Sequence, residues 1–289
     1  MNVGAPFVHW EPGLPPERLS ERLFDGALVV FRGLPAVEAL RQRVVALLRA
    51  AFADDDPETA ERRLPPDLFR KRAMQARRQV EDDAEVDTHW SAISEAVGYP
   101  ADEILQDRVR LRAVPASNEA RGRVVRPLPV HRDTWASGVQ AQVNWWMPLF
   151  PLADDRTMLL WPDRFRTPVR NTAASWDYET LRAKGFKDYP LLPEAEEDPG
   201  TSAVPVRIAP GSLLGFAAAH LHASVGDDPD RARFSLDTRT VWTADLTAGR
   251  AAPDVDGGGN PPNWDMFARP STATARGNEI DRPTGGAAG

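Results

Sequence analysis

One short segment of the sequence, His131-Arg132-Asp133, carries an imidazole and a carboxylate two positions apart. On a β-strand, residues i and i+2 point to the same face, so His131 and Asp133 can both face the interior of a fold. An imidazole beside a carboxylate supplies two of the three ligands of a 2-His-1-carboxylate site for Fe(II). The chain has no cysteine, which excludes disulfides, thiolate metal sites and a cysteine nucleophile.

The third ligand of such a site must be a histidine far along the chain. Of the five histidines, His220 and His222 are the two that lie downstream of Asp133. Both belong to the apolar run 212–225, which predicts a strand, and both lie on one face of an ideal strand. A bulge could exchange them. On spacing alone, either histidine can complete the site.

A candidate anchor for a carboxylate lies downstream of His220 and His222. Arg233 and Ser235 again share one strand face. The guanidinium fork matches the geometry of a carboxylate, so this pair predicts a binding site for a carboxylate co-substrate. Arg239 lies on the same face and is a rival for the contact, although Asp237 and Arg239 could instead form a supporting ion pair.

Polar side chains also follow the metal motif on a predicted strand, where Gln140, Gln142, Asn144 and Trp146 share one face. Polar groups inside a barrel need partners. Gln142 and Asn144 are therefore candidates for contact with the co-substrate or the iron-bound species. The alternative is that this face is the solvated side of the sheet.

Two further patterns are less specific. Arg108, Arg110 and Arg112 share a strand face, and we expect two of them at the surface, although the set could hold an anionic substrate. The segment Asp254-Val-Asp256-Gly-Gly-Gly-Asn260 resembles a calcium loop, but its fifth position is Gly258, so we interpret it as a turn. A kinase reading of His-Arg-Asp fails because no glycine-rich loop precedes the motif.

Hydrophobic periodicity predicts the elements that must position these residues. A buried strand is expected between Gly26 and Gly33, an amphipathic helix over 35–52 and further helices within 57–98. From residue 108 the period changes to two, which indicates an antiparallel sandwich or barrel. The expected strands cover 108–114, 124–130, 140–146, 157–161, 203–208, 212–225 and 233–242. An insertion over 163–199, rich in charge and proline, contains a short helical piece at 178–184 and is a candidate lid.

Composition limits the partners. The 289 residues are 42% hydrophobic and 27% charged, which is ordinary for a soluble globular protein. The net charge of −7 argues against a general binder of the phosphate backbone of nucleic acids. No apolar stretch is long enough to span a membrane, and the N-terminus does not resemble a secretory signal. We therefore expect a cytoplasmic protein that acts on a small molecule.

Taken together, these motifs resemble the Fe(II)/2-oxoglutarate-dependent oxygenases, near their phytanoyl-CoA-hydroxylase-like branch. The resemblance rests on HRDTW, VNWWMPL, LHAS and RFSLDTRTV, and it covers about residues 108–245. It implies a double-stranded β-helix (a jelly roll, or cupin-like core). It also implies iron on His131, Asp133 and His222, with 2-oxoglutarate bound to the iron and its distal carboxylate on Arg233 and Ser235.

The implied reaction uses O2 and hydroxylates, desaturates or cyclises a small molecule, with release of succinate and CO2. Because Asp133 is a carboxylate, the sequence departs from the halogenases of the family. The expected organisation is one structural domain with a mostly helical flank (1–107), a mainly β catalytic core (108–246) and an irregular tail (247–289). The alternatives are a cupin-like binding protein without turnover and a jelly-roll isomerase or epimerase.

Overall fold

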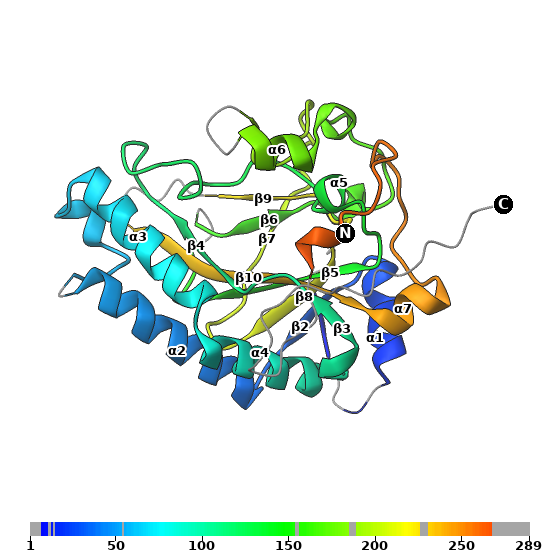
Figure 1. The fold of residues 1–289 in the computed structure, drawn as a ribbon, viewed down its shortest axis with the longest axis horizontal. Helices are drawn as coiled ribbons and strands as arrows, with labels where there is room; N and C mark the ends of the chain where they lie inside the picture. The colour runs from blue at the N-terminus through cyan, green and yellow to red at the C-terminus, as the bar shows by residue number, and fades with distance from the viewer. Residues whose placement is uncertain are drawn as a thin grey trace.

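The computed structural model describes residues 7–10, 13, 15–53, 55–153, 156–184, 189–225 and 231–267. Its N-terminal part is mainly helical, and its larger helices lie along one face of a mixed sheet (Figure 1). These helices are α2 (Pro35–Phe52), α3 (Pro66–Glu81) and α4 (Ala84–Val97), and the shorter α1 (Pro16–Phe24) precedes them in the chain. None of the described helices is long and apolar enough to cross a membrane.

The local sequence explains where these helices begin and end. Helix α2 covers the predicted range, with Pro35 in its first turn, where a backbone N–H has no intrahelical partner. Its apolar stripe is buried, as the three- and four-residue spacing predicts. Asp83 caps α4 by accepting hydrogen bonds from two backbone N–H groups, and Gly98 ends that helix with φ of 106°.

The main sheet has seven strands in the order β1-β2-β8-β5-β10-β3, and β4 also pairs with β10. All its pairs are antiparallel except β1 with β2. The strands are β1 (Phe7–His9), β2 (Leu28–Phe31), β3 (Ile104–Gln106), β4 (Arg110–Val114), β5 (Gln142–Pro148), β8 (Leu213–Ala217) and β10 (Arg233–Trp242).

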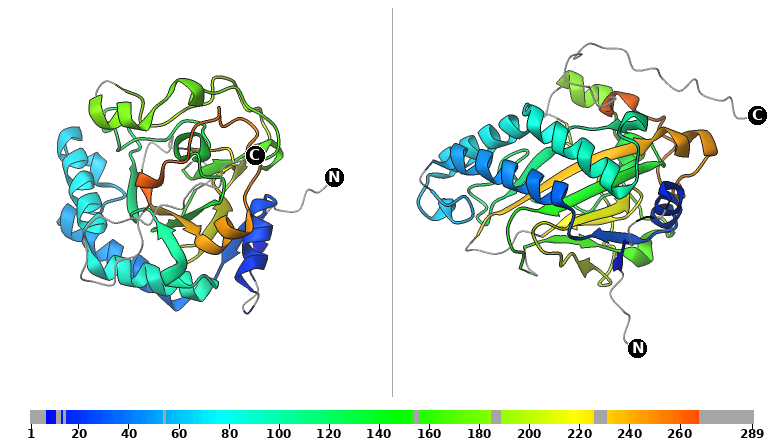
Figure 2. Two further views of the ribbon diagram at one scale, coloured as in Figure 1. Left: turned by 45° about the vertical axis from the view of Figure 1, so that its right-hand side comes forward. Right: turned by 90° about the horizontal axis from the view of Figure 1, so that it is seen from below.

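A second sheet of three strands, in the order β7-β6-β9, lies on the side of the main sheet away from helices α2–α4 (Figures 1 and 2). Its strands are β6 (Met158–Leu160), β7 (Val204–Pro205) and β9 (His222–Ser224). The remaining helices are α5 (Thr134–Ser137), α6 (Tyr178–Lys184) and α7 (Thr243–Ala248). Short 3-10 turns occur at Ala60–Arg62, Ala101–Glu103, Pro162–Arg164, Ala173–Ser175 and Trp264–Met266.

Strand alternation divides the side chains of the main sheet between two environments. On β5, Val143 and Trp145 join the large apolar core shared with the helices. Gln142, Asn144 and Trp146 point the other way and are buried too, so the alternative of a solvated face is wrong. Trp146 packs with apolar side chains of β6 and β8 in a second cluster between the two sheets.

Several expected elements differ from the structure. The range 124–130 contains no strand, and the run 212–225 is broken by a turn into β8 and β9, which belong to different sheets. Much of the 163–199 insertion is packed: Phe165, Val169 and Ala173 are each at most 4% exposed. Beyond α7, the described segment 249–267 has one 3-10 turn and buries Phe267 against the core. Residues 268–289 of the expected tail lie outside the described residues.

Candidate metal centre

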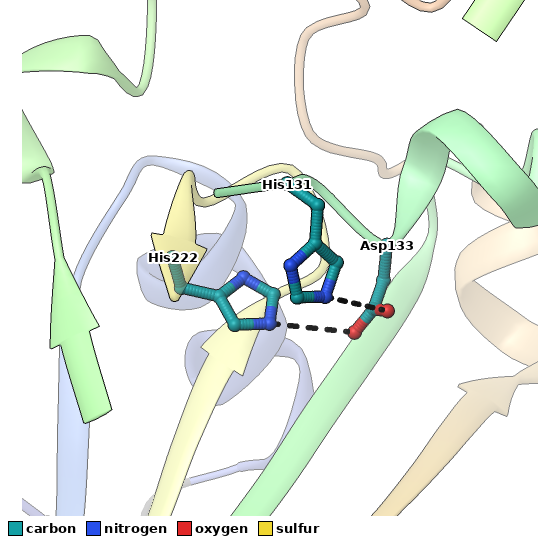
Figure 3. Close-up of side chains that lie close together, drawn as sticks. All are labelled: His131, Asp133 and His222. Atoms are coloured by element: carbon teal, nitrogen blue, oxygen red, sulfur yellow. Dashed lines mark ion pairs between the residues drawn. The ribbon is translucent and has the colours of Figure 1, made fainter. Parts of the chain in front are cut away.

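The structure brings His131, Asp133 and His222 together in a buried group that could hold a metal ion (Figure 3). One ligand atom from each residue lies within 4.8 Å of the others. His131 Nε2 is 3.7 Å from Asp133 Oδ1, and His222 Nε2 is 3.9 Å from Asp133 Oδ2. The three residues are 2%, 9% and 7% exposed, respectively.

Backbone pairing, more than a continuous strand, places these side chains. His131 and His222 form an isolated antiparallel bridge, with both N–H···O distances at 2.9 Å. Asp133 is helical (φ −68°, ψ −27°) and caps α5, while its N–H donates to the Ala218 carbonyl at 3.1 Å. His131 and Asp133 are thus close together as predicted, but the reason given for it, a shared strand face, is wrong.

Hydrogen bonds orient both imidazoles toward the carboxylate. His131 Nδ1 lies 2.8 Å from the Pro129 carbonyl, and His222 Nδ1 lies 3.0 Å from the His220 carbonyl. A carbonyl only accepts, so each Nδ1 must carry the proton and each Nε2 keeps its lone pair. Burial lowers the pKa of His131 to about 3 and also lowers the pKa of His222. Both rings are therefore neutral near pH 7, which is the form that binds metals.

The Asp133 carboxylate is held from two sides. Arg239 Nη2 donates to its Oδ1 at 2.9 Å, and Asn144 Nδ2 donates to its Oδ2 at 2.6 Å. Burial alone would raise the pKa of Asp133, but the charge of Arg239, with smaller contributions from the neighbouring histidines, brings it well below the usual range. Gln142 does not line the cavity and acts on this carboxylate only through Asn144, to which it donates at 2.8 Å.

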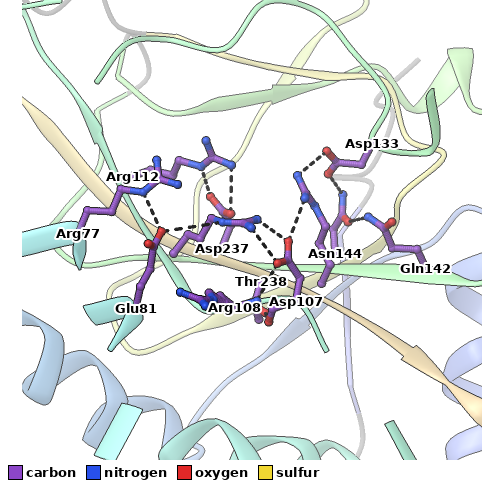
Figure 4. Close-up of polar contacts among 12 residues, drawn as sticks. Arg77, Glu81, Asp107, Arg108, Arg112, Asp133, Gln142, Asn144, Asp237 and Thr238 are labelled. Carbon is purple, nitrogen blue, oxygen red and sulfur yellow. Dashed lines mark hydrogen bonds and ion pairs between the residues drawn. The ribbon is translucent and has the colours of Figure 1, made fainter. Parts of the chain in front are cut away.

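A chain of charged side chains continues from this carboxylate into the sheet (Figure 4). The second nitrogen of Arg239, Nη1, donates to Asp107 Oδ2 at 3.0 Å, and Arg110 binds the same carboxylate. Beside them, Arg112 pairs with Asp237 through two nitrogens. Asp237 and Arg239 therefore do not form the ion pair considered from the sequence. Asp237 pairs with Arg112, and Arg239 pairs with Asp107 and Asp133. Neither Asp107 nor its link to Arg239 carried a recognisable signal in the sequence.

Arg233 differs from its neighbours because no acidic partner faces it among the described residues. It is 3% exposed and donates to Ser224 Oγ at 3.0 Å and to Ser235 Oγ at 3.5 Å, while its Nε has no partner there. The guanidinium lies 5.8 Å from the Trp146 ring centre. Burial, reinforced by the charge of Arg112, lowers the pKa of Arg233 to about 10. A buried cation without a counter-charge is suited to an anionic ligand.

These groups line one cavity between the two sheets. Six of the seven residues expected at the site reach it: His131, Asp133, Asn144, His222, Arg233 and Ser235. Apolar walls come from Leu128, Trp146, Met158 and Phe216. Of the three arginines that were expected to share a strand face, Arg112 lines the cavity, Arg110 is half-buried and Arg108 is exposed.

His220 lies away from this cavity. It is fully buried, and its ring stacks on Phe165 with a centroid distance of 4.4 Å. Phe216 contacts both His220 and His222, at 6.2 and 5.4 Å between ring centres. His220 belongs to the turn that precedes β9, whereas His222 is the first residue of β9, so of the two only His222 faces Asp133.

Several solved structures resemble this chain at low sequence identity. No protein-family model and no curated protein matches the sequence. A solved non-heme monooxygenase, ThoJ in its apo form, is 18% identical with a TM-score of 0.48, covering 78% of this chain and 77% of that chain. The epimerase SnoN, in complex with Fe3+, alpha ketoglutarate and nogalamycin RO, is 17% identical with a TM-score of 0.44, covering 78% and 83%.

A third structure, EvdO2 from Micromonospora carbonacea var. aurantiaca complexed with 2-oxoglutarate, is 15% identical with a TM-score of 0.43, covering 80% of this chain and 93% of that chain. Of these neighbours, SnoN is in complex with Fe3+ and alpha ketoglutarate, and EvdO2 is in complex with 2-oxoglutarate. At such identities and TM-scores, the likeness carries no assignment of individual residues or of a reaction.

Proposed function

We propose that this protein is an Fe(II)/2-oxoglutarate-dependent oxygenase that acts on a small molecule. One observation carries the proposal: two neutral imidazoles and an ionised carboxylate meet in the same buried cavity as an arginine that has no acidic partner among the described residues. The donor set of His131, Asp133 and His222 fits Fe(II), since it matches the 2-His-1-carboxylate arrangement of such enzymes. Bound Fe(II) supplies the oxidative chemistry in which 2-oxoglutarate and O2 become succinate and CO2 while a substrate C–H bond is hydroxylated.

Arg233 is the proposed anchor for the distal carboxylate of 2-oxoglutarate, with help from Ser235. Its guanidinium is buried and free of carboxylates within the described chain, whereas Arg239 already binds Asp107 and Asp133. The Ser224 hydroxyl, 3.0 Å from Arg233 Nη2, keeps the guanidinium oriented. Arg233 therefore suits the co-substrate better than its rival on the same strand.

The other polar residues prepare the ligands. Arg239 and Asn144 each bind one oxygen of Asp133, so the carboxylate stays ionised and cannot rotate freely. We propose that Asn144 also lies beside the bound co-substrate. Gln142 fixes the orientation of the Asn144 amide by donating a hydrogen bond to its oxygen. Trp146, Met158 and Phe216 exclude water from the reacting C–H bond.

The finer structural features belong to the same proposal. We propose that the two sheets around the cavity form a double-stranded β-helix spanning 108–246, with 1–107 as a helical flank of the same domain. The 163–199 insertion is proposed as the cover of the cavity. Because part of it is packed against Trp135 and Leu221, we expect any movement to be confined to a portion of the insertion.

An anaerobic titration with Fe(II) and then 2-oxoglutarate tests the proposal, followed by a screen of small molecules for O2-dependent release of succinate. We expect one Fe(II) per chain, and 2-oxoglutarate binding that requires the metal. Asp133→Ala should lose Fe(II) and turnover while the fold survives. A binding protein would take up both ligands without succinate release, and a metal-dependent isomerase would turn over without O2. Retained iron stoichiometry in Asp133→Ala would contradict the proposed ligand set.

A further inference from the structure

Arg132, which stands between two of the candidate ligands, is 1% exposed and does not line the cavity. Its guanidinium instead connects three distant segments. Nη1 donates to the carbonyl of Ala219, in the turn that leads to His222. Nη2 donates to the carbonyls of Arg164 and Thr167 in the insertion, at 2.7 and 2.9 Å.

The fourth contact of Arg132 reaches the C-terminal segment. Its Nε donates to Asp256 Oδ2 at 3.1 Å. The same carboxylate accepts hydrogen bonds from Trp135 Nε1 at 2.7 Å and from the Val169 N–H at 2.9 Å. Side-chain exposure of this pair is 1% for Arg132 and 7% for Asp256. The aspartate that the sequence placed in a calcium-like turn thus has both oxygens bound by protein donors.

Further contacts hold the C-terminal segment against the chain that follows the ligands. The Asn263 N–H donates to the Ser137 carbonyl at 2.7 Å, and Asn260 Nδ2 donates to the Ala173 carbonyl at 3.0 Å. Gly138 has φ of +63°, and a Cβ there would lie 2.6 Å from the Pro261 carbonyl oxygen. Only glycine permits this approach.

The ligand-bearing segment needs such support because it belongs to no continuous strand ladder. His131 makes a single isolated bridge, and Asp133 begins a four-residue helix. Metal affinity depends on ligands that are held in place before the metal arrives, and partners behind the ligands supply that order. Without Asp256, the buried charge of Arg132 and the indole N–H of Trp135 would lose their shared acceptor.

We propose that Arg132 and Asp256 form a positioning pair that preorganises the candidate metal ligands, so that the C-terminal segment 252–267 is part of the metal centre. The inference rests on the proposed metal site and extends it to a residue that touches neither metal nor co-substrate. It makes Asp256 the point where the C-terminal segment, the insertion and the ligand segment meet.

Binding of Co(II) to the whole 289-residue chain tests the role of this pair. The measurement needs no substrate and no catalytic turnover. Asp256→Asn keeps the size of the side chain and removes its charge, whereas Asp256→Ala removes every acceptor. The matched control is Asp245→Asn. Asp245 is also a buried carboxylate, 1% exposed, with Arg250 Nε at 2.7 Å and Ser20 Oγ at 2.6 Å, and it lies outside the cavity.

We expect Co(II) affinity to fall about tenfold in Asp256→Asn and further in Asp256→Ala, at a temperature where each variant is fully folded. The visible ligand-field spectrum of the bound Co(II) should change in both. Asp245→Asn should lose thermal stability but keep the wild-type affinity and spectrum. This pattern separates positioning from a general loss of stability.

Wild-type affinity and spectrum in Asp256→Ala would overturn the inference while leaving the proposed function intact. Equal losses in Asp256→Asn and Asp245→Asn would also overturn it, because the effect would then follow stability alone. A wild-type chain that binds no Co(II) would overturn the proposed metal site and, with it, the positioning pair.

Discussion

Arg233 and Arg239 face the same cavity from β10, but only Arg239 has carboxylate partners among the described residues. Arg239 binds Asp107 and Asp133 at 3.0 and 2.9 Å. Arg233 contacts two serine hydroxyls and the face of Trp146. One strand therefore presents two guanidinium groups with different tasks: one is committed to the protein, and the other is free to bind an anion.

Arg233→Leu should weaken 2-oxoglutarate binding by about ten- to a hundredfold. A charge-assisted contact contributes about 1.5–3 kcal/mol, and 1.36 kcal/mol corresponds to about a factor of ten. Arg233→Lys should recover part of the loss, because it keeps the charge without the planar fork. Anaerobic calorimetry on the Fe(II)-loaded protein measures this, with the exposed Arg108→Leu as control. An unchanged dissociation constant in Arg233→Leu would remove Arg233 as the anchor.

Arg239→Leu should act mainly on stability and on the metal. It leaves Asp133 without its ion pair, and breaking a buried pair costs about 3–5 kcal/mol in free energy of unfolding. Urea unfolding of the metal-free protein measures this cost. Arg18→Leu is the control, since its pair with Glu21 is 67% and 49% exposed and should contribute at most about 1 kcal/mol. If Arg239→Leu kept its Fe(II) and still weakened 2-oxoglutarate more than Arg233→Leu did, the two roles would have to be exchanged.

Parallel alanine substitutions should separate the two downstream histidines. His222→Ala should lose Fe(II), because its Nε2 faces Asp133. His220→Ala should keep Fe(II), because its ring stacks on Phe165 and does not line the cavity. Metal content after anaerobic loading and desalting gives the answer. The reverse pattern would transfer the ligand role to His220.

The metal-free protein should lose stability as the pH falls below about 6.5, the ordinary pKa of an unfolded histidine. Burial lowers the pKa of His131 and of His220 to about 3. Between about pH 6.5 and pH 3, these histidines are therefore protonated in the unfolded chain and neutral in the folded chain. Each such histidine contributes a slope of about 1.4 kcal/mol per pH unit between about pH 6.5 and pH 3. Asp133, with its lowered pKa, adds stability above the unfolded value near 3.9 that is lost as the pH falls further.

His220→Phe isolates one of these contributions. The substitution keeps an aromatic ring against Phe165 and removes one titrating group. The free energy of unfolding, measured in urea at several pH values, should then depend on pH with a slope smaller by about one proton. Identical slopes in the wild type and in His220→Phe would mean that His220 takes up a proton in the folded state.

Local patterns predicted the elements well where a single stretch of chain decides them. Helix α2 begins and ends as its apolar spacing predicts, and the strand between Gly26 and Gly33 is β2. The run 212–225 predicts one strand because both of its halves are apolar. The turn before His222 divides it, and a change of sheet leaves no mark in hydrophobicity alone.

The site was predictable in its residue types and only partly in its geometry. His131, Asp133 and His222 do converge, but a helical Asp133 replaces the expected strand residue. The contact of Asp133 with Arg239 was not predicted, since the two residues lie 106 positions apart. The contact of Arg132 with Asp256, 124 positions apart, was not predicted either. Such contacts depend on how distant segments pack, and a single sequence does not record that.

The pairing of β5 with β10 is unbroken from Ser235 to Val241, and this limits how the chain can vary. A one-residue insertion between Arg233 and Arg239 would turn one guanidinium toward the helices, into the apolar core around Phe234 and Leu236. Burying an unpaired cation there is prohibitive. Length changes in this stretch are therefore tolerated only in steps of two, or where a bulge absorbs the extra residue. Natural variants and engineered libraries should accordingly keep the number of residues between Arg233 and Arg239 constant, while the surrounding loops vary in length.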